Sequence, residues 1–212
     1  MRVTLIINPL PQADDWALLS DGTVAVMRVL DYHVDYYRPD GSKYASEKLP
    51  FDWKQITDDD KTALVDSLKK LADQAMERTA AGGARGGFRT LIEPVPAEKL
   101  PDYYPPVRQG SSIADRDGNL WVIPSTSKLS EEMAMGTMNG RGGMMGGGMP
   151  GAAPAPANQP PIIYDVVNPQ GKLVERVKLP GGRQVVGFGP NKTLYLLGRE
   201  GRGVFLETVK LQ

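Results

Sequence analysis

Alternating hydrophobic and polar positions dominate most of this chain, a period-two pattern that is typical of half-buried β-strands. The alternating runs are short, and turn sequences rich in Asp, Asn, Pro and Gly separate them. Asp21-Gly22 and Asp117-Gly118 each lie between two such runs, which predicts antiparallel hairpins because both turn residues accept a positive φ. The pattern therefore predicts an all-β protein. Its expected strands are residues 3–7, 16–20, 23–28, 32–38, 43–49, 112–117, 119–123, 162–167, 172–179, 184–188, 193–197 and 204–211.

One stretch follows the helical period instead. Thr57 and Asp60 approximate a capping box, and the carboxylates at 58–60 complement the positive end of a helix dipole. Apolar residues then recur at spacings of three and four, which predicts a buried stripe of Leu64, Leu68, Leu71, Ala75 and Met76. We expect an amphipathic helix from about Thr57 to about Arg78, packed through the three leucines and lying outside the strand pattern.

The strands fall into repeating units. The first turns of three units stand at Asp21, Asp117 and Asn191, which are 96 and 74 residues apart. Two insertions lengthen these spacings: a helical and Pro-rich stretch of about 50 residues, and a Gly/Met-rich tract of about 32. Without the insertions the spacings shorten to roughly 46 and 42 residues, which is close to the repeat length of a four-stranded propeller blade. We therefore expect a partial β-propeller of about three four-stranded antiparallel blades with one inserted α-helix.

The repeat also predicts the domain boundaries. Residues 1–49 form the first blade plus an N-terminal strand, and residues 50–110 form the helical and Pro-rich insertion. Residues 111–180 form the second blade, interrupted at about 128–160 by the Gly/Met-rich tract, and residues 181–212 form a third, incomplete blade. Gly and Pro dominate the tract, so we expect most of it to have no fixed structure.

The segment Asp115–Val122 resembles the hairpin of bacterial six-bladed β-propellers of the NHL, TolB-like and SMP-30-like kind. Asp14–Gly22 and Leu49–Trp53 are similar to segments of exported propeller proteins of soil bacteria. The resemblance implies a rigid ring of blades whose loops bind ligands, and a periplasmic or secreted location. For SMP-30-like propellers it also implies lactone hydrolysis with a divalent metal held by acidic and Asn side chains. Spacing alone selects no such set among the candidates Asp15, Asp115 and Asp165.

Composition and charge narrow the function classes. Lys plus Arg and Asp plus Glu both total 25, so the net charge is zero, which argues against nucleic acid or an anionic membrane as the main partner. The absence of cysteine excludes disulfides, thiolate catalysis and Cys-ligated zinc. No apolar run approaches the roughly 18 residues of a membrane span. The apolar run at residues 3–7 is too short for the core of a signal peptide, so we expect no export signal.

One acidic turn has part of a calcium-binding pattern. Asp115, Asp117 and Asn119 match the first half of an EF-hand loop. The Gly that such a loop needs at its sixth position is replaced by Leu120, and the Glu at its twelfth position is replaced by Thr126. A plain hairpin turn, in which Asp hydrogen-bonds its own backbone, is the favoured interpretation.

A histidine and an aspartate share one strand face. His33, the only histidine, alternates into the same face as Asp35 and Tyr37, and a His–Asp pair can act as a general base. Because no nucleophile or metal ligand accompanies the pair, a solvated or hydrogen-bonded strand residue is the favoured interpretation. The carboxylates at 58–60 could bind a cation, but the start of a helix explains them without a ligand.

Met-rich and Arg-Gly tracts complete the candidates. Six of the nine methionines fall between Met133 and Met149, and thioethers suit Cu(I), although the surrounding Gly and Pro favour a mobile insertion. Arg lies among Gly at 82–87, 181–183 and 198–203, a composition that phosphate and RNA sites also use. None of these tracts stands between a strand and a helix, so solvated loops are favoured. No catalytic, cofactor-binding or metal-binding residue is therefore assigned.

The residues favour a non-catalytic propeller scaffold that binds a protein, peptide or glycan through its loops. The alternatives are an SMP-30-like metal-dependent hydrolase and a propeller half that self-assembles. Three blades cannot close a ring, so we expect apolar end faces that carry residues such as Leu18, Val24, Val186 and Leu196. Either a head-to-tail dimer closes a six-bladed ring, or the chain is the C-terminal part of a longer propeller. In both cases the spare strand 3–7 could complete a blade.

Overall fold

The computed structural model describes residues 2–81, 89–107, 110–125, 161–200 and 203–211, and these residues form two compact units. The described part of the helical unit comprises residues 2–11, 53–81 and 89–104. The described part of the sheet unit comprises residues 12–52, 105–107, 110–125, 161–200 and 203–211. The Gly/Met-rich tract and the Arg-Gly tract at 82–87 lie outside the described residues, so the expectations for them stay predictions.

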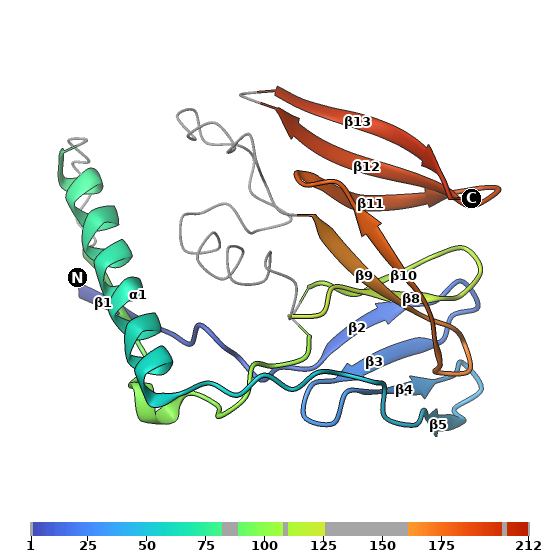
Figure 1. Cartoon of the computed structure of the whole chain (residues 1–212), viewed down its shortest axis with the longest axis horizontal. Coiled ribbons are helices and arrows are strands. Elements are labelled where there is room, and N and C mark those ends of the chain that lie inside the picture. Colours follow the sequence, from blue (N-terminus) through green and yellow to red (C-terminus); the bar gives the residue numbers. More distant parts are fainter. Residues whose placement is uncertain (1, 82–88, 108–109, 126–160, 201–202, 212) are drawn as a thin grey trace. The chain divides into compact units, whose positions relative to one another are not determined.

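The sheet unit contains three antiparallel sheets, in each of which neighbouring strands follow one another in the sequence (Figure 1). Sheet 1 consists of β2 (Asp15–Leu18), β3 (Val24–Arg28), β4 (His33–Tyr37) and β5 (Lys43–Ala45). Sheet 2 consists of β7 (Ile113–Ala114), β8 (Leu120–Val122), β9 (Ile162–Val167) and β10 (Leu173–Leu179). Sheet 3 consists of β11 (Arg183–Gly189), β12 (Thr193–Glu200) and β13 (Gly203–Lys210). The prediction of a mainly antiparallel β protein with one α-helix is confirmed for the described residues.

The two Asp-Gly turns form the hairpins that the sequence predicts. Gly22 and Gly118 have φ values of 85° and 81°, a region that residues with a Cβ atom rarely adopt. In the first turn the Asp21 carboxylate accepts the N–H of Thr23 at 2.9 Å. In the second, Asp115 accepts the N–H groups of Asp117 and Asn119 at 2.9 and 2.8 Å. Local side-chain hydrogen bonds therefore set the register of both hairpins.

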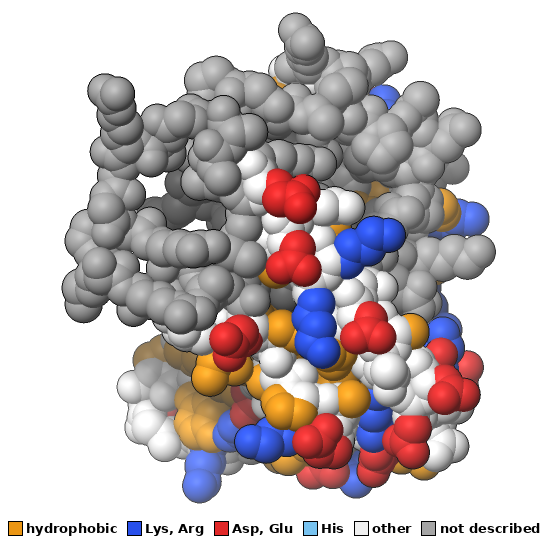
Figure 2. Space-filling model, turned by 90° about the vertical axis from the view of Figure 1, so that its left-hand side faces the viewer, with side chains coloured by type: hydrophobic (Ala, Val, Ile, Leu, Met, Phe, Trp, Pro, Cys, Tyr) orange, Lys and Arg blue, Asp and Glu red, His pale blue; other side chains and the backbone are white. Residues whose placement is uncertain are grey.

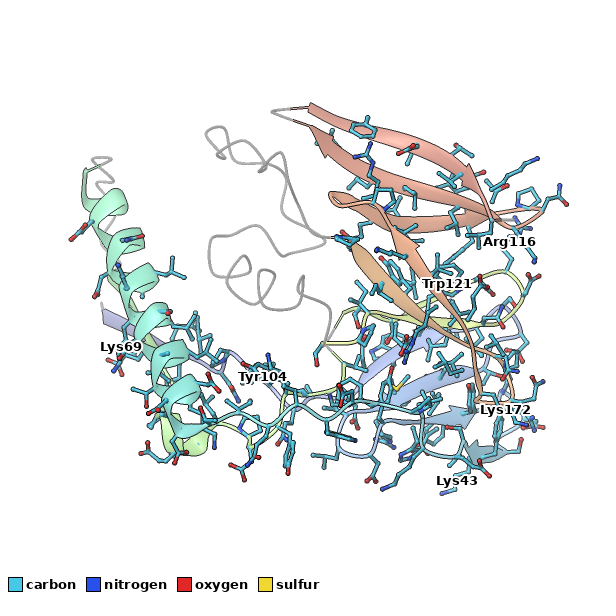
Figure 3. All side chains as sticks on the ribbon, viewed as in Figure 1. Lys43, Lys69, Tyr104, Arg116, Trp121 and Lys172 are labelled. Atoms are coloured by element: carbon cyan, nitrogen blue, oxygen red, sulfur yellow. The ribbon has the colours of Figure 1, made fainter. Side chains whose placement is uncertain are left out.

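Sheet 2 is the middle layer of the sheet unit, and its inner strands β8 and β9 are buried on both faces. On one face Leu120, Val122 and Val167 join the core formed by the inner side chains of sheet 1. On the other face the Trp121 ring lies 5.1 Å from the ring of Phe188 in sheet 3, and the Tyr164 hydroxyl accepts the Val185 N–H at 3.2 Å. Figure 3 labels Trp121 within the sheet unit. Sheets 1 and 3 therefore bury one face each.

Two of the four residues expected on the apolar end faces are exposed. Leu18 and Val186 are exposed and Val24 is half-buried. Leu196 is the exception, because it is buried with 1% exposure. The prediction that Leu196 lies on an apolar end face is wrong, because the β11–β12 register pairs Leu196 with the buried Val185, on the face that packs against sheet 2.

The helical unit contains α1 (Asp58–Ala81), the short 3₁₀ helix η1 (Ala97–Lys99) and a two-stranded sheet. The capping box forms as predicted: Asp60 N–H donates to the Thr57 hydroxyl and Thr57 N–H donates to the Asp60 carboxylate, both at 3.1 Å. Leu68 is buried as expected, whereas Leu64 and Leu71 are only half-buried. The remaining buried positions of α1 in the described side chains are Lys61, Val65 and Ala72. Among the described residues no helix has the length and apolar character needed to cross a membrane.

The first strand has a partner that the sequence did not predict. β1 (Arg2–Ile7) pairs in parallel with β6 (Arg89–Pro94), from Arg2 beside Arg89 to Ile7 beside Pro94. β6 lies in the helical and Pro-rich insertion, in which the sequence predicts no strand. Strand 3–7 is therefore not spare, because it pairs with β6 within the helical unit.

Candidate functional site

Sheet 1 presents large apolar side chains on the face that points away from sheet 2. Trp16 is 63% exposed and Leu18 60%, whereas Ala17 between them is buried. The register places Val26 beside Trp16, and it places Val24 beside both Leu18 and Tyr37. We call this surface, defined by Trp16, Leu18, Val24, Val26 and Tyr37, the Trp16 face.

An ion network lies on the same face of sheet 1. The Arg28 guanidinium donates to the Asp14 carboxylate and to the Asp35 carboxylate, each at 2.6 Å. It also donates to the Tyr37 hydroxyl at 3.1 Å. Because Arg28 contacts groups on both sides of β3, its side chain is held in one orientation. Tyr37, one of the aromatic residues of the Trp16 face, is thereby tied to the network.

The charges of the network stabilise one another. Burial alone would raise the pKa of the Asp14 carboxyl, but the hydrogen bond from the Val29 N–H and the Arg28 guanidinium outweigh it and hold the pKa below its ordinary value. The hydrogen bonds to Asp14 and Asp35 raise the pKa of the Arg28 guanidinium above its ordinary value. At neutral pH, Arg28 therefore stays charged and paired beside the apolar part of the face.

His33 and Asp35 meet as the strand pattern predicts. His33 Nε2 lies 3.3 Å from Asp35 Oδ1. The other oxygen of Asp35 accepts from Arg28, so the carboxylate is already compensated by a permanent cation. Within the described residues, neither side chain hydrogen-bonds a serine or threonine hydroxyl that could serve as a nucleophile. Through this contact His33 adjoins the Arg28 network.

The three carboxylates considered for a hydrolase site each have different donors. Asp15 accepts the N–H groups of residues 110–112 at 2.7 to 3.0 Å. Asp115 accepts the Asn119 amide and the Trp121 indole N–H in addition to its two turn N–H groups. Asp165, which is buried, accepts from the Tyr32 hydroxyl at 3.0 Å and from Arg176 at 2.9 Å. No group of three or more His, Asp or Glu side chains in the described chain is placed to hold a metal ion.

The other candidate residues that the structure describes belong to a helix cap or to an ion pair. Asp60 belongs to the helix cap, and Arg183 pairs with Glu207 at 3.2 Å. The methionines between residues 133 and 149 and the glycines at 82–87 lie outside the described residues.

The helical unit has a cleft of about 640 Å³ between α1 and the segment from Glu93 to Glu98. Asp66, Asp73 and both of these glutamates contribute carboxylates, and Val65 contributes apolar surface. The four carboxylates are exposed, and Figure 2 shows acidic and basic side chains interspersed on this side of the molecule. Because solvent already satisfies such groups, we assign no ligand to the cleft.

The sequence predicts an apolar end face that carries Leu18 and Val24, but it does not place Trp16 on that face. Residues 15–19 read Asp-Trp-Ala-Leu-Leu, in which both alternating sets contain apolar residues. The small size of Ala17 could have indicated that its side of the strand packs closely against another layer. The hydrophobicity of Trp16 indicates the opposite, because it favours burial of the tryptophan. In comparisons with known proteins, no family model, no curated protein and no solved structure matches this chain.

Proposed function

We propose that this protein is a non-catalytic binding scaffold, a partial β-propeller of three blades, that binds a protein partner through the Trp16 face. One observation carries the proposal: a rigid sheet displays exposed Trp16 and Leu18 next to the fixed Arg28 network. Folded proteins rarely leave contiguous apolar surface open unless it is used. The side chains offered are also those that dominate protein interfaces, namely Trp, Tyr and Arg.

The arrangement of the sheets supports a protein rather than a small ligand. Sheet 2 is covered on one side by sheet 1 and on the other by sheet 3, so stacking of antiparallel sheets is how this chain buries apolar faces. The Trp16 face is the outer surface of the same kind of sheet. A flat partner surface with apolar side chains at its centre fits it, and the Arg28 network offers polar partners beside the apolar centre.

The sheet stacking also supports the propeller-like interpretation of the three sheets. Sheets 1 and 2 each have four strands in sequence order, as propeller blades do. The hydrolase alternative has less support, because Asp15, Asp115 and Asp165 are each held by separate structural donors.

A second candidate is head-to-tail self-assembly. Sheet 3 also exposes apolar side chains on its outer face, where Val186, Val204 and Leu206 are exposed. The Trp16 face of one copy could stack on this surface of another. Such stacking would continue the layer order of the sheet unit.

Photo-crosslinking distinguishes these candidates. A benzophenone amino acid in place of Leu18 is activated in cells of the organism that makes the protein. The matched control carries the same group in place of Lys172, an exposed turn residue of sheet 2. We expect one heterologous protein to be linked from position 18 and not from position 172. The purified partner should bind the wild-type protein at least tenfold more tightly than Trp16→Ala, by analogy with aromatic hot spots.

Two results would contradict the primary proposal. A product of twice the chain mass from position 18 supports head-to-tail assembly instead. Equal labelling from positions 18 and 172, or none from either, means that the Trp16 face has no specific partner.

A further inference from the structure

The third sheet lacks the fourth strand that the other two have. In sheet 1 the fourth strand is β5, and in sheet 2 it is β10. Sheet 3 ends at β13, which among the described residues pairs only with β12 (Figure 1). The free edge of β13 therefore occupies the place where sheets 1 and 2 each have another strand.

The hydrogen-bond pattern shows which backbone groups of β13 are unpaired in the ladder. The Leu211 N–H donates to the Lys192 carbonyl at 3.0 Å, directly beyond the pair Lys210–Thr193. Backbone groups alternate in direction along an antiparallel strand, so residues 205, 207 and 209 also face β12. The N–H and C=O groups of Val204, Leu206 and Thr208 consequently point away from the sheet.

β13 has fewer protective features than the other two fourth strands, and its one lysine, Lys210, is its last residue. β5 is three residues long and begins with Lys43. β10 has a register irregularity and carries Glu175, Arg176 and Lys178. β13 has eight residues, its pairing with β12 is continuous, and from 203 to 209 it contains no Pro, Lys or Arg. Its single carboxylate in that range, Glu207, is engaged by Arg183. Such an edge is a template for another strand.

We propose that a second copy of this chain pairs its β13 antiparallel to the first, across a twofold axis. The second copy is the occupant that fits, because it supplies an open edge of the same length and the pairing covers both edges at once. Val204 and Leu206 are 62% and 65% exposed. Their side chains would meet those of the second copy on the outer face of a continuous six-stranded sheet.

Charge disfavours one register of this pairing. With the axis at Glu207, the two Glu207 carboxylates would face each other in a pair about 4.5 Å apart between Cα atoms, which is unfavourable. With the axis at Leu206, the two leucines face each other and Glu207 faces the second copy's Phe205. The Leu206 register therefore pairs apolar side chains at the centre. The resulting dimer has two Trp16 faces, although the pairing itself does not depend on the proposed function.

Thr208→Pro tests the pairing directly. Proline at this position removes an N–H that points away from the sheet, whereas the hydrogen bonds from β13 to β12 remain. Thr208→Ala is the matched control, because it changes the side chain and keeps the N–H. Light scattering at a protein concentration of about 100 µM should give twice the chain mass for the wild-type protein and for Thr208→Ala. It should give the mass of a single chain for Thr208→Pro. Circular dichroism should show the same strand content in all three.

A cysteine variant provides a second measurement if Thr208→Pro does not fold. The chain has no cysteine, so Leu206→Cys introduces a single thiol. Across the axis its Cα would lie about 5.5 Å from its counterpart, within the range that a disulfide spans. Mild oxidation should link Leu206→Cys into a dimer much faster than Val186→Cys, whose residue lies on β11 of the same sheet.

The proposal is overturned by a monomeric wild-type protein, by a Thr208→Pro variant that folds and remains dimeric, or by equal linking of the two cysteine variants. A dimer that survives Thr208→Pro but is lost in Trp16→Asp would instead identify stacking through the sheet faces. Failure of the β13 pairing is thus distinguishable from failure of the proposed partner binding, which the crosslinking from position 18 measures.

Discussion

Sheet 1 and sheet 3 are the two end layers of the sheet unit, yet their open surfaces differ. Sheet 1 ends in the short, lysine-containing strand β5, and its outer face combines Trp16 with the Arg28 network. Sheet 3 has an aliphatic outer face and ends in the long, unprotected strand β13. The two proposals therefore use different groups: side chains on a face in sheet 1, and backbone groups along an edge in sheet 3.

The largest expected change in stability distinguishes the inner face of sheet 3 from its outer face. Leu196→Ala should lower the free energy of unfolding by about 3 kcal/mol, because it removes a fully buried side chain and leaves a cavity. Val186→Ala, on the outer face, should change it by no more than about 0.5 kcal/mol. Urea denaturation measures both. Similar losses in the two variants would mean that both faces of sheet 3 are covered in solution.

The contact between sheets 1 and 2 should show the next largest effect. Tyr32→Phe removes the hydroxyl that donates to the buried Asp165 carboxylate, which should cost about 2 kcal/mol because the acceptor is charged. The matched control is Tyr37→Phe, whose hydroxyl is on the exposed Trp16 face and should matter by less than about 0.5 kcal/mol. If Tyr37→Phe were the more destabilising variant, the assignment of inner and outer faces in sheet 1 would be reversed.

Trp16→Ala should affect binding far more than stability. Its side chain is mostly exposed in the folded chain, so truncation should shift the free energy of unfolding by about 0.5 kcal/mol or less. Crosslinking from position 18 should decrease strongly at the same time. A loss of several degrees in the melting temperature, measured by circular dichroism, would show that Trp16 stabilises the fold itself.

The smallest effect concerns the pH dependence of sheet 1. The pKa of Asp14 is depressed in the folded protein, so its contribution to stability is present above the ordinary pKa of 3.8 and is lost as the pH falls through the lower folded value. The urea midpoint of the wild-type protein should exceed that of Asp14→Asn at pH 7, and the two midpoints should converge as the pH falls below 3.8. A constant difference between these pH values would contradict the role of Asp14 in the network.

Several features of the fold could be predicted because they depend on neighbouring residues. The Asp-Gly hairpins, the Thr57–Asp60 capping box and the pairing of His33 with Asp35 all appear as expected. Each depends on contacts within a few residues, or on the alternation of one strand. Leu68 could likewise be placed in the core from the helical period.

Other features depend on contacts between distant parts of the chain. β6 was not predicted, because a short strand in a Pro-rich stretch becomes recognisable only through its parallel pairing with β1. The helix buries Val65 and Ala72 more fully than Leu64 and Leu71, because the surface against which α1 packs decides which side of the apolar stripe is covered.

The sequence by itself determined the antiparallel hairpins with their turns, the single helix and its cap, since hydrogen bonding and periodicity within short segments specify them. The tertiary structure decided which apolar set of each strand is buried. Trp16 and Leu18 compete with Ala17 and Leu19 for the interior, and packing against sheet 2 selects the second set. Close-packed layers accept only side chains of fitting volume. That selection leaves Trp16 exposed and creates the candidate binding face.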